Sequence, residues 1–264
     1  MSEFECLHDK AVIEEFLRRD TDLHLYELGD LDDFFWPQTQ WYGRRGNDGR
    51  LAALALLYVY SGNTQPTLLG FGKGSAITDL VHSLVGVLPP WFYAHLSPGV
   101  AEALKGKYQI DTHGSHQKMS LKKATVARAW PDSGAVRLGP ENLAEVLQLY
   151  AESYPGNWFD PRMLETREYF GIREGSRLVS IAGVHVFSPA MRVAALGNIT
   201  THPSRRKKGL ATRATRDLCR SLLEKVDHIG LNVAADNRTA ISCYRKLGFE
   251  VVAPYQELAA HLVP

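Results

Sequence analysis

The segment from Val193 to Leu222 constrains the fold more than any other part of the chain. It reads VAALGNITTHPSRRKKGLATRATRDLCRSL: an apolar run that ends at Thr201, a turn at Pro203, and Gly209 directly before a helical pattern. The apolar positions of that pattern share one helical face: Leu210, Ala214, Leu218 and Leu222. A strand that runs through a glycine turn into an amphipathic helix predicts an α/β fold in which the helix covers the sheet.

The four basic residues from Arg205 to Lys208 admit several interpretations: a nuclear address, a nucleic-acid patch, a solvated helix start, or a phosphate cradle. The formal net charge of the 264 residues is +1, so no global field recruits nucleic acid. The start of a helix repels cations unless an anion binds there, which counts against a merely solvated face. The choice therefore depends on the local context of the run.

The position of Gly209 favours the phosphate cradle. The first turn of a helix leaves backbone N–H groups without partners, and a glycine there permits a close approach. We therefore predict a pyrophosphate site to which Lys207 and Lys208 add charge, with Arg205 solvated. The turn contains neither G-x-x-x-x-G-K-[ST] nor G-x-G-x-x-G.

A second signal lies at residues 237–249, NRTAISCYRKLGF. Asn237 stands where a helix N-cap is expected, and Gly248 stands where the helix would end. Taken alone, this segment is an ordinary capped helix with a half-buried tyrosine, Tyr244. The two segments together are far more specific than either one.

The pattern R-x-x-G-x-A at Arg206, Gly209 and Ala211 resembles the Q/R-x-x-G-x-G/A loop of the GNAT superfamily of acyl-CoA-dependent N-acetyltransferases. The pattern N-x-x-A-x-x-x-Y-x-x-x-G-F from Asn237 is similar to the next block of that superfamily. The resemblance extends from Ala135 to the C-terminus. It implies the acyl-CoA N-acyltransferase fold, an α/β (α+β) arrangement with a mixed, mostly antiparallel central sheet flanked by helices. It also implies acetyl-CoA as co-substrate, an amine acceptor and no metal.

By the same resemblance, the strand splays at a bulge near Asn198 and pairs there with the pantetheine arm of the cofactor. The implied cofactor-binding residues are Ile199, Thr201, Arg206, Lys207, Lys208, Gly209, Leu210, Ala211, Thr212 and Asn237. Tyr244 is implied to lie near the sulfur, where a phenol can donate a proton to the departing thiolate. A backbone N–H of the strand would stabilise the tetrahedral oxyanion.

The residue that accepts the amine proton stays open. The strand 193–201 contains no carboxylate, although the family commonly uses an acidic residue there. His185, His202 and Glu168 are candidates. A chain of ordered water molecules is an equally good alternative.

Residues 67–86, TLLGFGKGSAITDLVHSLVG, again combine a strand, a glycine-rich turn and a helix. The order of elements in the first half repeats that of the second half, so we predict a tandem arrangement with domains at residues 1–130 and 131–264. The turn lacks R-x-x-G-x-G/A, and we expect the N-terminal domain to be a diverged GNAT-like domain that binds no cofactor.

Two further groups invite functional interpretations. His113 and His116, with Asp111, fall in or beside the polar stretch 112–123, which we interpret as a loop between strands rather than a metal site. The aromatic group 34–43, FFWPQTQWYG, either lines an acceptor cleft between the two halves or packs as core.

Compartment and partners follow from composition. Cys6, Cys219 and Cys243 are too scattered for a disulfide framework or a zinc site and suggest a reducing compartment. The N-terminus lacks the apolar region of a signal peptide, and the longest apolar run, residues 51–60, is too short to span a bilayer. We expect a cytoplasmic protein without a nucleic-acid or membrane partner; a homodimer stays open.

The predicted function is transfer of the acetyl group of acetyl-CoA to a primary amine of an unidentified acceptor, with Tyr244 as general acid. One alternative is an amino-acid N-acyltransferase that uses a longer acyl-CoA. Others are a non-catalytic acyl-CoA sensor and a nucleic-acid-binding protein, whose affinity would fall steeply with salt.

Overall fold

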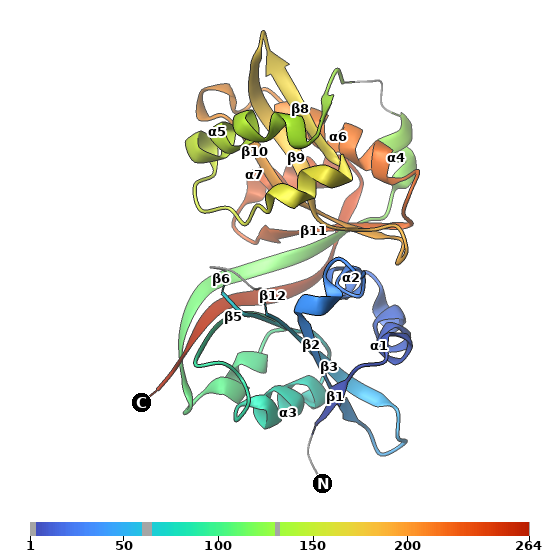
Figure 1. Ribbon diagram of the computed structural model, residues 1–264, viewed down its shortest axis with the longest axis vertical. Coiled ribbons are helices and arrows are strands. Elements are labelled where there is room, and N and C mark those ends of the chain that lie inside the picture. Colours follow the sequence, from blue (N-terminus) through green and yellow to red (C-terminus); the bar gives the residue numbers. More distant parts are fainter. Residues whose placement is uncertain (1–3, 60–64, 130–132, 264) are drawn as a thin grey trace. The chain divides into compact units, whose positions relative to one another are not determined.

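The computed structural model describes residues 4–59, 65–129 and 133–263 (Figure 1). The chain forms two compact units. Unit 1 comprises residues 1–118, 233–236 and 251–264, and unit 2 comprises residues 119–232 and 237–250. Strands β6 (Tyr108–Leu121), β11 (His228–Ala234) and β12 (Phe249–Leu262) have residues in both units. The boundary predicted between residues 130 and 131 lies outside the described residues.

The strands of unit 1 pair in the order β1, β2, β3, β4, β5, β12. Neighbouring strands are antiparallel except β4 and β5, which are parallel. Besides β12, the unit contains β1 (Glu5–Leu7), β2 (Thr39–Arg45), β3 (Leu51–Tyr58), β4 (Thr67–Gly70) and β5 (Trp91–Leu96). The parallel pair requires a crossover, and helix α3 (Ser75–Leu84) supplies it.

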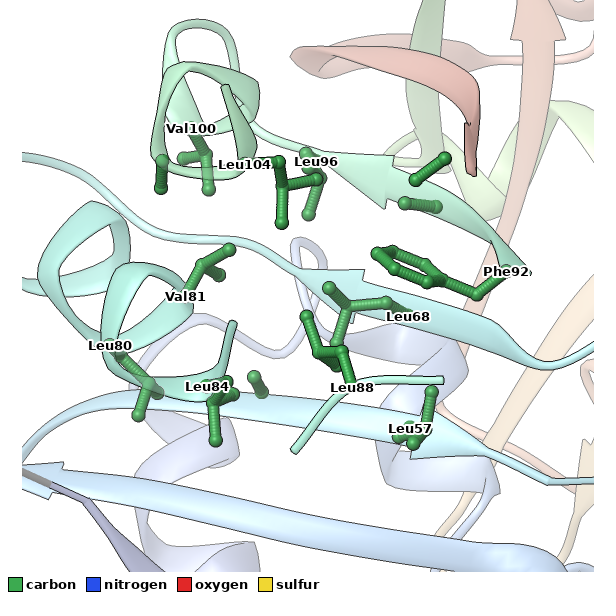
Figure 2. Packing of buried hydrophobic residues seen from close by; sticks show 14 of the residues in the cluster. Leu57, Leu68, Leu80, Val81, Leu84, Leu88, Phe92, Leu96, Val100 and Leu104 are labelled. Atoms are coloured by element: carbon green, nitrogen blue, oxygen red, sulfur yellow. The ribbon is translucent and has the colours of Figure 1, made fainter. Parts of the chain in front are cut away.

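The core of unit 1 lies between α3 and the strands. Figure 2 shows side chains of α3 pointing toward β3, β4 and β5, with further contributions from the 3-10 helix Val100–Leu104. The labelled members are Leu57, Leu68, Leu80, Val81, Leu84, Leu88, Phe92, Leu96, Val100 and Leu104. Helix α1 (Lys10–Leu17), capped by the Asp9 carboxylate, and helix α2 (Leu25–Gly29) complete the unit, with 3-10 helices at Arg18–Asp20 and Trp36–Gln38.

The strands of unit 2 pair in the order β11, β10, β9, β8, β7. They are β7 (Val136–Leu138), β8 (Tyr169–Glu174), β9 (Arg177–Ser188), β10 (Val193–Thr201) and the part of β11 in this unit. Only β10 and β11 are parallel, and α6 (Leu210–Leu222) connects them. The helices are α4 (Ala124–Ala129), α5 (Leu143–Ser153), α6 and α7 (Arg238–Lys246), with 3-10 helices at Pro140–Asn142, Pro161–Thr166 and Pro203–Arg205.

Both units therefore contain antiparallel strands, one parallel pair and a helix that crosses between its strands. The predicted mixed, mostly antiparallel sheet flanked by helices is confirmed, as is the repeated order of elements in the two halves. One local expectation was wrong. The polar stretch 112–123 is mainly strand β6, because backbone hydrogen bonds such as that from Ala235 N–H to Ser115 O hold it irrespective of side-chain polarity. Strand β12 after Gly248 is a single long strand that continues through Pro254.

Candidate active site

The parallel strands β10 and β11 pair along only part of their length. Their register runs from Val193 opposite His228 to Leu196 opposite Leu231. Strand β10 continues to Thr201 and β11 to Ala234 without further register between them in the described residues. Backbone groups of β10 beyond Leu196 are thus available to a ligand on the side facing β11.

Two bulges follow each other where β10 pairs with β9. The register passes from Ala195 opposite Val186 to Leu196 opposite Val184, so His185 is an extra residue on β9. Between Gly197 and Thr200 the extra residue is on β10. Bulges bend a strand and redirect side chains, and they are frequent next to active sites. The splayed strand predicted from the resemblance therefore has a structural basis in this chain.

The paired glycines at the bulges make room for two rings. A Cβ on Gly197 would lie 1.8 Å from Cδ2 of His185. A Cβ on Gly183 would lie 2.0 Å from Cε1 of Tyr169. No side chain fits at either position without displacing a ring, so both glycines are required by packing.

Asn198 holds the bulge of β10 in place. Its φ is 54°, a left-handed conformation that asparagine tolerates better than most residues. Its carbonyl accepts the Tyr150 hydroxyl at 3.0 Å, and its Nδ2 donates to the Tyr169 hydroxyl at 3.2 Å. Burial raises the pKa of both tyrosines, so both stay protonated at neutral pH. Sequence reasoning did not find this role, although a Gly-Asn pair inside an apolar strand indicates a bulge.

The turn between β10 and α6 has the conformation expected of an anion site. Lys207 has a φ of 66° and Gly209 a φ of 74°, so left-handed residues precede the helix. No described side chain caps α6, and its first turn contains no acidic residue. The N–H groups of Leu210, Ala211 and Thr212 therefore stand at the positive end of a helix of 13 residues.

The basic residues of this turn have different roles. Arg205, expected to be solvated, forms an ion pair with Glu174 at 2.5 Å. Arg206 is close enough to donate from Nε to the Thr201 carbonyl and from Nη2 to the Ser153 carbonyl, each at 3.3 Å, so it ties the turn to the ends of β10 and α5. Lys207 and Lys208 are exposed. Within the described residues neither lysine forms an ion pair, so their charges could neutralise an anion at this turn.

Helix α7 is linked to the first turn of α6. Cys243 Sγ lies 2.9 Å from Oγ1 of Thr212. Asn237 caps α7, with its side-chain oxygen accepting the Ala240 N–H at 3.1 Å. Tyr244, on the same helix, is 8% exposed, packs edge-on against Phe249, and makes no hydrogen bond to another described residue. Burial raises the pKa of its phenol, which keeps it protonated at neutral pH.

The three candidate proton acceptors have different surroundings. Glu168 is fully buried and its Oε1 is paired with Arg137 at 3.1 Å and with Lys225 at 2.5 Å. His202 lies 3.3 Å from a Glu152 oxygen and caps a 3-10 helix through the Ser204 N–H. His185 alone of the three packs against the bulged backbone, over Gly197.

Comparison with known proteins agrees with this geometry. Residues 143–249 match the model of the acetyltransferase (GNAT) family. These residues form a GNAT domain. The resemblance predicted from two motifs is confirmed for this part of the chain, which supports an acyltransferase of the GNAT type. Comparison with the curated proteins found no match.

Several solved structures share the fold. A Drosophila protein is 15% identical, with a TM-score of 0.71 over 100% of this chain and 99% of its own. A tandem GNAT protein from the clavulanic acid biosynthesis pathway is 16% identical, with a TM-score of 0.58 over 99% of each chain. A putative GNAT acetyltransferase from Novosphingobium aromaticivorans is 21% identical, with a TM-score of 0.56 over 78% of this chain and 91% of its own. The likeness to the tandem protein over both halves agrees with a GNAT-like unit 1.

Unit 1 contains a polar cluster around Glu257, which includes His116, one of the two histidines considered above as metal ligands. His116 lies on β6, not in a loop, with Nε2 3.5 Å from Oε2 of Glu257. The same oxygen accepts the Tyr93 hydroxyl at 2.7 Å, and the other accepts that of Tyr255 at 2.7 Å. The ring of His113 lies 5.2 Å from that of Tyr93, with the planes tilted by 51°. Within the described residues, no group of three or more histidine, cysteine or acidic side chains is arranged to hold a metal ion.

The aromatic group at residues 34–43 packs mainly as core. In the aromatic group 34–43, Phe35, Trp41 and Tyr42 are buried within unit 1, whereas Phe34 is exposed. Trp41 stacks on Trp36 with ring centroids 6.1 Å apart. No helix among the described residues is long and apolar enough to cross a membrane.

Proposed function

We propose that this protein transfers the acetyl group of acetyl-CoA to a primary amine, and that residues 131–264 contain the catalytic domain. The observation that carries the proposal is the parting of β10 from β11 after Leu196, on the strand that leads into the uncapped start of α6. This combination offers an extended ligand backbone hydrogen bonds along β10 and offers its phosphates the N–H groups of a helix start.

The cofactor arm would lie along β10. Its amides would pair with the backbone of Ile199 and Thr201. When the cofactor binds, Arg206 would give up its hydrogen bond to the Thr201 carbonyl, which would then accept from the cofactor. Two buried amide oxygens without partners in the described residues support a polar ligand here: Oδ1 of Asn198 on β10 and Oδ1 of Asn232 on β11. Asn232 directly follows Leu231, the last residue of β11 that pairs with β10.

The pyrophosphate would lie at the turn before α6. The N–H groups from Lys207 to Thr212 would donate to its oxygens, and Lys207 and Lys208 would add positive charge. Gly209 suits this position because its φ of 74° is unfavourable for other residues and a Cβ there would project into open space. Asn237 would contact the arm of the cofactor next to α7.

The chemistry is a direct attack of the amine on the thioester. The amine nitrogen bonds to the carbonyl carbon, and a backbone N–H of the bulged strand stabilises the oxyanion. Collapse of the intermediate breaks the carbon–sulfur bond, and the Tyr244 phenol donates its proton to the thiolate. The raised pKa of Tyr244 keeps that proton available at neutral pH. No step requires a metal.

The remaining expectations stay with this proposal. The free cysteines Cys219 and Cys243 suit a reducing cytoplasm. The partners would be acetyl-CoA and the amine acceptor, with no nucleic acid and no membrane. A homodimer is compatible with these partners and is tested by measuring the mass of the protein in solution.

A thermal-shift screen of primary amines in the presence of CoA, followed by a thiol-release assay with acetyl-CoA, tests the proposal. Thiol release that depends on both substrates, with acetylated amine as product, supports it. Faster release from propionyl-, hexanoyl- or benzoyl-CoA than from acetyl-CoA would favour an amino-acid N-acyltransferase with a longer donor. Tight CoA binding without turnover across the amines would instead favour an acyl-CoA sensor.

A further inference from the structure

The loop 154–160, which follows α5, carries three aromatic side chains with different surroundings. Phe159 is anchored: its ring lies 5.1 Å from that of Tyr150 and 5.9 Å from that of Tyr169. Tyr154 and Trp158 are exposed, at 46% and 42%. The loop thus uses one ring to attach to the bulge-holding tyrosines and leaves two large rings partly open to solvent.

One of the exposed rings lies next to a group suited to proton transfer. Trp158 packs against His185, with ring centroids 5.6 Å apart and planes at 48°. Single exposed aromatic residues are common on protein surfaces. A partly exposed indole on an anchored loop, packed against a histidine at a strand bulge, calls for a more specific explanation.

His185 is held in one place by three features. It is the extra residue of the β9 bulge, its ring occupies the space that Gly197 leaves free, and Trp158 covers the ring. The imidazole remains half-buried rather than enclosed. A histidine fixed beside the strand proposed to hold the thioester is well suited to take a proton from an attacking amine.

We propose that Trp158 and His185 form the acceptor site, which takes a primary amine on a short carbon chain that ends in an aromatic ring. The ring of the acceptor stacks on the open face of Trp158, and its ammonium reaches the imidazole of His185. This proposal rests on the proposed function and names the acceptor class and the proton acceptor of that same site. Stacked rings gain interaction beyond the area that they bury, which favours aromatic over aliphatic amines.

The proton transfers balance as follows. The ammonium gives one proton to the neutral imidazole of His185, and the freed nitrogen lone pair attacks the thioester carbon. When the carbon–sulfur bond breaks, the thiolate takes the Tyr244 proton and the tyrosinate takes the second proton of the nitrogen. The imidazolium of His185 then releases its proton to solvent. The products are the amide, the free thiol of CoA and one proton.

The test uses the full-length protein with phenethylamine and n-butylamine as acceptors. We expect kcat/KM to be at least tenfold higher for phenethylamine, and Trp158→Leu to lower kcat/KM at least tenfold more for phenethylamine than for n-butylamine, so that most of the preference is lost. A matched control exists in unit 1, where Trp91 is 46% exposed and its ring lies 6.2 Å from that of His261. Trp91→Leu should leave the ratio unchanged.

His185→Ala tests the proton acceptor. The variant leaves a space bounded by Gly197 and Trp158, which added imidazole can enter. We expect kcat to fall about 100-fold and to recover at least tenfold with imidazole, as for a lost general base. His261→Ala is the control and should be insensitive to imidazole. A purely structural role of His185 predicts no imidazole-dependent recovery, and that result would overturn the assignment.

The outcomes separate this inference from the proposed function. Thiol release with butylamine at the same rate as with phenethylamine, or a preference that Trp158→Leu leaves intact, would overturn the aromatic acceptor while leaving acetyl transfer in place. Absence of thiol release with every amine would defeat the proposed function. In that case, titration of phenethylamine into the CoA-loaded protein still tests the acceptor site, because a missing binding signal overturns it.

Discussion

Unit 1 and unit 2 each contain one parallel strand pair joined by a helix, β4–α3–β5 and β10–α6–β11, but the two pairs end differently. In unit 1, the register with β5 runs from Thr67 through Gly70, along the whole of β4. In unit 2, the register with β11 covers Val193–Leu196, and β10 continues to Thr201 beyond it. The parallel pair of unit 1 is therefore closed, because β4 stays paired along its whole length. The parallel pair of unit 2 is open, because β10 continues beyond its last pairing with β11.

The closure of unit 1 extends into its glycine-rich turn. The N–H of Ser97 donates to the Gly70 carbonyl at 3.0 Å, and Oγ of Ser97 accepts the Gly72 N–H at 3.2 Å. Polar groups that a ligand would require are thereby satisfied within the chain. In unit 2, Asn198 and Tyr150 instead stabilise a bulge, which keeps β10 from following β11.

From the proposed function and this comparison we predict that a parallel pair with a glycine turn does not by itself hold acyl-CoA. We propose that the strands must also part, and that specific side chains must stabilise the parting. Both helices have a glycine with positive φ as N-cap: Gly209 is in the left-handed helical region, with φ 74° and ψ 11°, whereas Gly74 has φ 77° and ψ −168°. A positive-φ glycine alone therefore does not distinguish the two units, whereas the strand pairing does.

Replacing a buried phenol in each unit should have the largest effect and should separate function from stability. Tyr244→Phe should lower kcat about 100- to 10,000-fold, because it removes the proposed proton donor to the thiolate. CoA affinity should be nearly unchanged. The measurements are steady-state thiol release and titration of CoA into the protein.

The matching change in unit 1 is Tyr255→Phe. Tyr255 is fully buried and donates to Glu257 at 2.7 Å, so its loss should reduce the free energy of unfolding by about 1.5–3 kcal/mol. Turnover of the folded protein should stay within a factor of two. If Tyr244→Phe kept full turnover with every accepted amine, the proton-donor role would be wrong.

The two N-cap glycines offer a second matched pair. An alanine at position 209 must adopt a left-handed conformation at a cost of about 1–2 kcal/mol. Gly74→Ala should lose at least as much stability, because φ 77° with ψ −168° is a conformation that essentially only glycine adopts. Gly209→Ala should also weaken CoA binding about tenfold, because its Cβ would occupy space needed by the pyrophosphate. Calorimetric titration of CoA measures the difference. Equal affinities for CoA in the two variants would argue against a cradle at Gly209.

Sequence reasoning found the parts of this comparison that depend on local pattern. The apolar run 193–201, the glycine turn and the helical stripe from Leu210 predicted β10 and α6 correctly, and the order of elements predicted the repeat. It did not predict that β4 and β5 stay paired, since the Ser97 side chain that closes the turn is 25 residues from Gly72 in sequence. The anchoring of Asn198 by Tyr150 spans 48 residues and was missed for the same reason.

Acid should destabilise unit 1 through His95 on β5. Burial lowers the pKa of His95 to about 4, with Lys118 and His116 nearby acting in the same direction and Glu257 opposing them. An unfolded histidine has a pKa near 6.5, so the unfolded chain binds the proton first as the pH falls. This stability is complete above about pH 6.5 and is lost between about pH 6.5 and 4, by at most about 1.4 kcal/mol per pH unit.

Denaturant unfolding of wild type and His95→Asn across this range measures the slope. His95→Asn should flatten it. Below about pH 4.5 the Glu257 carboxylate adds a further loss: burial works to raise its pKa, but His95 and the Tyr93 and Tyr255 hydroxyls lower it overall. A slope unchanged by His95→Asn would assign the acid sensitivity to other groups.

The smallest expected effect concerns the hydrogen bond between Ser97 and Gly72 in the glycine-rich turn of unit 1. Ser97→Ala removes the acceptor of the Gly72 N–H and should cost about 1 kcal/mol of unfolding free energy. It should create no CoA affinity in unit 1, because the Ser97 N–H still donates to Gly70 and β4 stays paired along its length. Calorimetric titration of CoA into Ser97→Ala measures how many CoA molecules bind per chain. A second CoA bound by Ser97→Ala would mean that one side-chain hydrogen bond, rather than the strand pairing, keeps unit 1 closed.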